Sequence, residues 1–204
     1  MLPVMSGQVG FVLASASPRR RDLLAQIGRV AAVVIEPDID ESVVPGELPA
    51  QHAARLAREK CDAVAARAEA AGAYVLAADT VVACGRRILP KAEDDATVRR
   101  CLTLLSGRRH RVIGGICLRA PDGRYHERVV TTAVSFARLS AAEIAAYIAG
   151  GEGRGKAGGY AIQGRAAVFV RALNGSYSNV VGLSLFETER LFAGCGFPPA
   201  RHAE

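Results

Sequence analysis

A chain of 204 residues, of which 50% are hydrophobic and 23% charged, is long enough for one folded domain or two closely joined lobes. It has no apolar run near the ~20 residues that a membrane helix needs, so we expect no association with a membrane. The net charge of +6 favours an anionic partner, but the aromatic content of 5% argues against a nucleic-acid-binding surface.

The first predicted helix begins with three arginines, Arg19–Arg21. An apolar stretch of strand length ends at Ser15, Ser17 is a suitable N-cap, and Pro18 suits the first helical position. A helix N-terminus carries about half a positive charge, so cations are unfavourable there unless an anion binds among them. The segment therefore predicts a phosphate-binding turn between a strand and a helix, and the alternative is a solvated basic turn.

The rest of the chain alternates between predicted helices and strands. We expect strands at 30–36, 74–78 and 168–172, hairpins at 81–89 and 111–136, and helices at 49–71, 94–107, 140–149 and from 184 onward. Capping boxes, Ser140–Glu143 and Ser184–Glu187, start the last two of these helices. The hairpins favour an α/β fold with a mixed central sheet over a purely parallel one.

Asp79 is a candidate catalytic or metal-binding residue. It follows the apolar strand predicted at 74–78, and Val81 and Val82 come after it. A carboxylate in such surroundings stays ionised only if a metal or another cation compensates it, and otherwise it takes up a proton. Ligands of α/β sheets bind where strands end, which favours a functional role. The alternative is an aspartate that caps a backbone N–H at the strand end.

Lys60 lies on the apolar face of the helix predicted at 49–71, together with Leu56, Cys61 and Val64. A lysine in this position either extends its ammonium group to solvent or reaches into an anion site. The five cysteines are widely spaced and form no Cys-x-x-Cys pair, so we expect buried thiols in a protein of the reducing cytoplasm.

A glycine-rich segment, Gly150–Tyr160, has neither the spacing of a Walker A loop nor that of a dinucleotide fingerprint. Taken alone, it predicts a mobile loop. Gln163, just after it, is polar within an apolar stretch, and its amide can both donate to and accept from the edge of a base.

In this order and spacing, these segments resemble the Maf-like nucleoside triphosphate pyrophosphatases. The resemblance rests on Leu13–Arg20, Leu56–Lys60, Ala78–Thr80, Lys91, Leu105–Gly107, Gly155–Gly164 and Asn174–Leu183. It covers about residues 10–193 and implies a single domain over 1–204 with short extensions at both ends. The implied fold is an ITPase-like mixed α/β structure in which flanking helices cover a central sheet and two lobes enclose a cleft.

The resemblance also implies an activity, the hydrolysis of a nucleoside triphosphate between its α and β phosphates. Arg19, Thr80 and Gln163 match the specificity positions of the branch that acts on dTTP and UTP, and modified pyrimidine nucleotides are further expected substrates. The alternatives are the sister activity on 7-methyl-GTP and a nucleotide-binding regulator of cell division that does not hydrolyse its ligand. A homodimer is also implied.

The roles of single residues follow from the resemblance. Asp79 matches the catalytic base, and Glu41, with Asp40 as the second choice, joins it in holding a divalent metal, Mg²⁺ or Mn²⁺. The residues that match the triphosphate-binding positions are Ser15, Arg19, Arg20, Lys60 and Lys91. Family members usually have Lys-Pro after the hairpin, whereas this chain has Pro90-Lys91, which leaves the geometry of that turn open.

Overall fold

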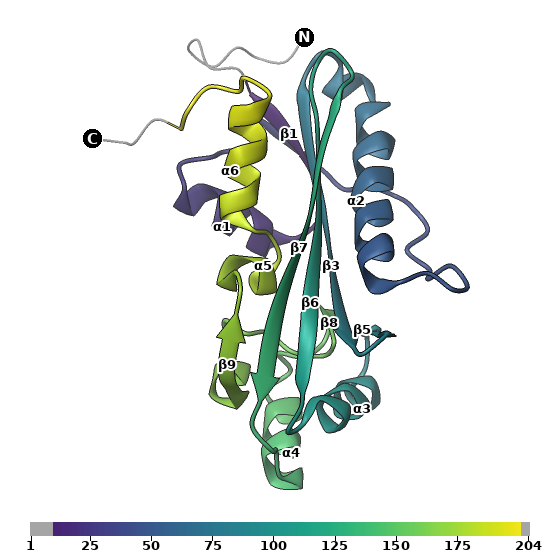
Figure 1. Cartoon of the computed structure of the whole chain (residues 1–204), viewed down its shortest axis with the longest axis vertical. Coiled ribbons are helices and arrows are strands. Elements are labelled where there is room, and N and C mark those ends of the chain that lie inside the picture. Colours follow the sequence, from purple (N-terminus) through teal and green to yellow (C-terminus); the bar gives the residue numbers. More distant parts are fainter. Residues whose placement is uncertain (1–9, 201–204) are drawn as a thin grey trace.

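The computed structural model describes residues 10–200, and its centre is a seven-stranded mixed sheet (Figure 1). The strands follow the order β2-β1-β3-β6-β7-β9, and β4 pairs with the end of β3. The first three in this order are parallel, and all other pairs are antiparallel. The strands are β1 (Phe11–Ala14), β2 (Val33–Ile35), β3 (Tyr74–Cys84), β4 (Arg87–Leu89), β6 (Arg109–Arg119), β7 (Tyr125–Phe136) and β9 (Val170–Asn174).

Helices cover both faces of this sheet, which confirms the predicted mixed α/β fold (Figure 1). The α2 helix lies on one face, α1, α5 and α6 lie on the other, and α3 and α4 pack together near one end. The helices are α1 (Pro18–Gln26), α2 (Pro49–Ala65), α3 (Asp95–Leu105), α4 (Ala141–Ala149), α5 (Tyr177–Val181) and α6 (Leu185–Gly194). None of the helices within residues 10–200 has the length and hydrophobicity needed to cross a membrane.

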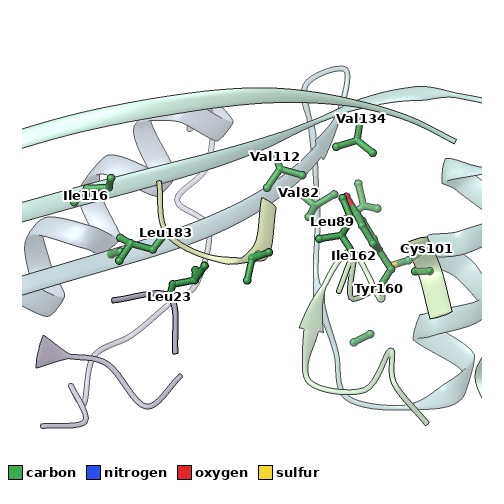
Figure 2. Packing of buried hydrophobic residues seen from close by; sticks show 14 of the residues in the cluster. Leu23, Val82, Leu89, Cys101, Val112, Ile116, Val134, Tyr160, Ile162 and Leu183 are labelled. Atoms are coloured by element: carbon green, nitrogen blue, oxygen red, sulfur yellow. The ribbon is translucent and has the colours of Figure 1, made fainter. Parts of the chain in front are cut away.

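A second, two-stranded sheet pairs β5 (Lys91–Ala92) with β8 (Lys156–Ala157). Next to it, Tyr160 and Ile162 pack with Val82, Leu89 and their neighbours in the larger apolar core (Figure 2). The chain that follows the glycine-rich segment is therefore part of the core, and the segment itself is anchored at both ends.

The β3 strand differs from its prediction. It does not end before Asp79 but continues to Cys84, because β6 pairs with it from Val75 to Ala83. Asp79 therefore lies in the middle of β3, and the alternative that it caps a strand end is wrong.

The α2 helix is shorter than predicted, because it ends at Ala65 and a 3-10 turn follows at Ala68–Ala70. The alanines favour a longer helix, but Ala70 and Ala73 are buried against β1 and β3, and this packing overrides their propensity. In α6, Ser184 occupies the N-cap position but its side chain forms no capping bond, so the predicted second capping box is absent.

The predicted N-terminal extension lies outside the described residues, and so does the end of the C-terminal one, residues 201–204. Phe197 lies within the described part of the C-terminal extension. It is 7% exposed and packs edge-on against Phe11 and Tyr74, so this part of the extension completes the core.

Candidate active site

One cleft of about 870 Å³ gathers every residue that the sequence assigns to the site. Its walls come from the β1–α1 turn, the acidic loop at 37–47, the middle of β3, the β4–β5 turn and the glycine-rich segment. The predicted residues that line it are Ser15, Arg19, Arg20, Glu41, Lys60, Asp79, Thr80, Lys91 and Gln163.

Asp79 projects from the middle of β3 and is paired with a buried lysine. Lys60, on α2, has its Nζ 2.6 Å from Oδ1 of Asp79 and 2.6 Å from Oε1 of Glu41. The side chains of Lys60 and Asp79 are only 7% and 10% exposed. Lys60 therefore reaches an anion site and supplies the cation that a buried carboxylate requires. We call Glu41, Lys60 and Asp79 the carboxylate cluster.

A glycine on β6 allows α2 to approach Asp79. Gly115 is the partner of Asp79 in the β3–β6 ladder, and a Cβ on it would overlap the carbonyl oxygen of Ala53 in α2. Because Gly115 has no side chain, the helix lies directly on the strand, and Lys60, two turns further along the helix, is within reach of Asp79.

The preceding glycine has the same role on the opposite face of the sheet. Gly114 is the partner of Thr80, and a Cβ on it would overlap Oδ1 of Asn179 in α5. Asn179 is fully buried, and its amide Nδ2 donates to the carbonyl oxygens of Val112 and Val130. These bonds hold α5 against the sheet. The residue after α5 is Gly182, whose carbonyl oxygen accepts a hydrogen bond from Arg20.

Arg20 is held in the cleft wall by three hydrogen bonds. Its Nε donates to the carbonyl oxygen of Gly182 at 3.0 Å, its Nη1 to Oγ of Ser15 at 3.1 Å, and its Nη2 to Oγ1 of Thr80 at 3.2 Å. A guanidinium has five N–H donors, so two remain for a ligand. Burial lowers the pKa of Arg20, while the negative charge of Asp79 opposes this effect.

The Ser15 hydroxyl is arranged to donate into the cleft. Its oxygen accepts hydrogen bonds from the backbone N–H of Ser17 at 3.1 Å and from Arg20. Both lone pairs are thus in use, and the remaining O–H can donate only to a further group such as a phosphate oxygen. Ser17 is the N-cap of α1 as predicted, although its own side chain makes no capping bond.

Thr80 faces Arg20. Its hydroxyl donates to the Gly182 carbonyl at 3.3 Å while accepting from Arg20. Because its only proton is in use, Thr80 influences a ligand chiefly through the position of the Arg20 guanidinium.

Three other cations in the cleft lack a close carboxylate partner. The Nε of Arg19 is buried and has no hydrogen-bond partner, and burial lowers the pKa of this side chain. The nearest carboxylate to Lys91 is that of Glu93 at 3.9 Å, and Lys156 forms no ion pair within residues 10–200. Burial and the positive charges of Arg19 and Lys91 lower the pKa of Lys156. We call Arg19, Lys91 and Lys156 the cation cluster.

The glycine-rich segment is hydrogen-bonded to the chain around the β4–β5 turn, whereas its composition predicts a mobile loop. The N–H of Gly155 donates to the Ala92 carbonyl at 2.7 Å, and that of Gly158 donates to the Pro90 carbonyl at 3.0 Å. Gln163 follows this pinned segment, lines the cleft and is exposed. Its amide forms no hydrogen bond to the described residues and is available to a ligand.

The acidic loop that carries Glu41 is clamped to α2. Arg55 donates from Nε to Oε1 of Glu47 at 2.7 Å and from Nη2 to the Ser42 carbonyl at 3.0 Å. The hydrogen bond from Arg55, with one from His52, lowers the pKa of Glu47 to about 2. This clamp fixes the backbone next to Glu41.

Comparisons with known proteins show which family the chain belongs to. The family model described as Maf-like protein matches residues 10–195. The chain belongs to the Maf-like family. It is 67% identical over 188 residues to the "dTTP/UTP pyrophosphatase" of Paramagnetospirillum magneticum, a match that covers 92% of this chain and 98% of that protein. It is 64% identical over 190 residues to the protein of the same name from Rhodospirillum rubrum, which covers 93% and 90% of the two chains.

Among solved structures, a nucleoside-triphosphatase / dITP/XTP pyrophosphatase from Mycobacterium abscessus matches 65% of this chain and 75% of its own. The identity is 20% and the TM-score 0.40, so the assignment to the Maf-like family rests on the family model and the curated relatives.

The carboxylates of this Maf-like protein fit the predicted divalent metal. One oxygen of Glu41 and one of Asp79 lie 2.6 Å from the Lys60 ammonium group, so the two carboxylates already share a cation, and a metal held by both would take the place of that ammonium group. Within residues 10–200 no group of three or more His, Cys, Asp or Glu side chains could hold a metal. Mg²⁺ is commonly held by one or two carboxylates together with substrate phosphates, so two carboxylates are sufficient. Asp40 instead accepts hydrogen bonds from Ser42.

Lys156 is the cleft residue that sequence reasoning missed. It lies inside the Gly155–Gly164 motif, where no neighbouring residue distinguishes a ligand-binding lysine from a solvated surface charge. The pairing of β5 with β8, which brings it to the cleft, joins segments 64 or more residues apart and has no local signal.

Proposed function

We propose that this Maf-like protein hydrolyses dTTP, UTP and modified pyrimidine triphosphates to the nucleoside monophosphate and pyrophosphate. The observation that carries the proposal is one cleft in which the carboxylate cluster, Arg20 and the cation cluster lie together. The positive charges of Arg20 and the cation cluster repel one another, and a bound polyphosphate would remove this repulsion. The two relatives described above, both named dTTP/UTP pyrophosphatase, support dTTP and UTP as substrates.

Asp79 is the general base of the proposed reaction. It orients the attacking water and accepts its proton, as a carboxylate within hydrogen-bond distance can do. The two free donors of Arg20 and the O–H of Ser15 bind phosphate oxygens, and Lys60 is assigned to the same triphosphate. A divalent metal, Mg²⁺ or Mn²⁺, held by Glu41 and Asp79 would neutralise phosphate charge and polarise the α phosphorus.

Gln163, Thr80 and Arg19 set the preference for pyrimidines in this proposal. The free amide of Gln163 supplies one donor and one acceptor to the edge of the base. In the Gln163→Glu variant the donor is lost, so we expect kcat/KM for dTTP relative to GTP to fall about 10-fold. An unchanged ratio would remove Gln163 from base recognition.

The experiment that tests the function measures pyrophosphate release from dTTP, UTP, GTP and 7-methyl-GTP, with and without Mg²⁺. We expect release from dTTP and UTP that depends on the metal. Preferential release from 7-methyl-GTP would assign the sister activity instead. Tight binding of nucleotide without release would favour the regulator that does not hydrolyse.

Two further predictions concern the setting of the enzyme. All five cysteines are free thiols, which supports a reducing cytoplasm as the compartment. The homodimer is tested by measuring the molar mass in solution, and a monomer at micromolar concentration would contradict it.

A further inference from the structure

The use of lysine in this chain is confined to the cleft. The sequence has 26 lysines and arginines, of which only three are lysines, Lys60, Lys91 and Lys156. All three line the cleft described above. Lysine presents a compact ammonium charge, whereas arginine presents a wide planar fork. The cationic residues outside the cleft are all arginines, so the three lysines in the cleft indicate positions that require a point charge.

Lys60 and Lys156 differ in what surrounds them. Lys60 is paired with two carboxylates, those of Asp79 and Glu41, both at 2.6 Å. Lys156 is half-buried, and among residues 10–200 its ammonium group forms no ion pair. Its charged neighbours in the cleft, Arg19 and Lys91, are themselves positive. A half-buried charge that only like charges surround costs stability unless an anion binds there.

The backbone holds Lys156 firmly relative to β3. Ala92 pairs with Lys156 in the β5–β8 sheet. Two residues further on, Gly158 has a φ of +67°, and a Cβ there would lie 2.7 Å from Cγ1 of Val82. The glycine thus lets the segment press directly on β3, three residues from Asp79, so the position of Lys156 relative to the catalytic base is fixed.

We infer that Lys156, with Arg19 and Lys91, binds the β and γ phosphates and so fixes the direction of the triphosphate in the cleft. This inference rests on the proposed function. The α phosphate then lies at Asp79, and the pyrophosphate leaves from the cation cluster.

The cation cluster lies where the proposed reaction develops negative charge. Water attacks the α phosphorus and loses a proton to Asp79, while the bond from this phosphorus to the α–β bridging oxygen breaks with its electron pair passing to that oxygen. The pyrophosphate carries the new negative charge, and Lys156 stabilises it together with Arg19 and Lys91.

The test compares Lys156→Met with wild type in inhibition by the two products, pyrophosphate and dTMP, in the presence of Mg²⁺. We expect inhibition by pyrophosphate to weaken about 10-fold or more, because a charge-assisted hydrogen bond is lost. Inhibition by dTMP should change less than about 2-fold, because dTMP retains only the α phosphate. The Lys156→Arg variant should recover only part of the affinity, because the wide fork replaces a point charge.

Arg154→Met is the matched control. Arg154 lies two residues away, pairs with Asp95 at 2.7 Å and does not line the cleft, so its loss changes the net charge equally without touching the site. We expect it to leave both inhibition constants unchanged. A weaker dTMP inhibition with unchanged pyrophosphate inhibition in Lys156→Met would reverse the assigned direction, and no change in either would overturn the inference.

A second measurement needs no variant. Acetylation of the wild-type protein with acetic anhydride, followed by peptide mass spectrometry, reports each of the three lysines separately. We expect pyrophosphate, but not dTMP, to protect Lys156, and unprotected Lys156 would contradict the inference. By contrast, a wild-type protein that releases no pyrophosphate from dTTP or UTP would overturn the proposed function itself.

Discussion

The two charged clusters of the cleft differ in how their charges are balanced. In the carboxylate cluster, the single cation Lys60 lies between Asp79 and Glu41. In the cation cluster, Arg19 and Lys156 form no ion pair with the described residues, and Lys91 has only a distant one. The charges of the first cluster are paired with one another, whereas those of the second are all positive and need an anion. Under the proposed function, the base is thus held in place before the substrate arrives, and the cations of the second cluster are free to bind its phosphates.

The largest effect should come from Asp79→Asn. The amide keeps the shape of the side chain but cannot accept a proton from water, so we expect kcat to fall about 10²- to 10⁴-fold. The affinity for dTTP, measured with the same variant by calorimetry, should remain within a few-fold of wild type. A variant as active as wild type would remove Asp79 from the chemistry and place the base elsewhere.

Two lysine variants, one in each cluster, test whether the charges are paired in the carboxylate cluster and unpaired in the cation cluster. Lys60→Met leaves a buried carboxylate without its cation, and we expect a loss of about 3 kcal/mol in the free energy of unfolding. Lys156→Met removes a charge that only like charges face, and the free energy should change by less than about 0.5 kcal/mol or rise. Urea denaturation of both variants measures this. Equal losses would mean that the two clusters do not differ as described.

The clamp on the acidic loop makes the stability of the folded protein depend on pH. The folded protein lowers the pKa of Glu47 from 4.5 to about 2, so its contribution to stability is complete above pH 4.5 and is lost as the pH falls toward 2. In the Glu47→Gln variant this contribution is absent. Between pH 4.5 and 2, wild type should therefore lose stability more steeply than the variant, and parallel curves would show that Glu47 makes no such contribution.

The smallest effect should come from Thr80→Val. The change removes one acceptor of Arg20 and one donor to Gly182. We expect kcat/KM for dTTP to fall about 5-fold, which corresponds to one hydrogen bond of about 1 kcal/mol. Thr80→Ser, which keeps the hydroxyl, is the matched control. A normal Thr80→Val enzyme would show that Arg20 is held by Ser15 and Gly182 alone.

The sequence predicts the local parts of this site well. The strand, turn and helix that carry Ser15 and Arg20 follow from adjacent residues, as do the hairpins and the capped helices α3 and α4. The apolar face that contains Lys60 left two outcomes open, and the structure shows a buried ammonium group that meets two carboxylates of the chain rather than solvent. These features depend on neighbours within a few residues, where propensity and periodicity are informative.

The missed parts depend on distant pairing. Asp79 lies inside β3 because β6 pairs alongside it, and no residue near Asp79 signals that partner. Lys156 reaches the cleft because β8 pairs with β5. In both cases the deciding interaction joins segments far apart in the chain, and a one-dimensional pattern carries no information about it.

Gly114 and Gly115 have a mechanical consequence. Next to Asp79 and Thr80, β6 has no side chains, so α2 and the Asn179 side chain of α5 lie directly against its backbone on opposite faces. Because these close contacts leave either helix little room to shift, the candidate site should keep its geometry up to the melting transition and then be lost in one cooperative step.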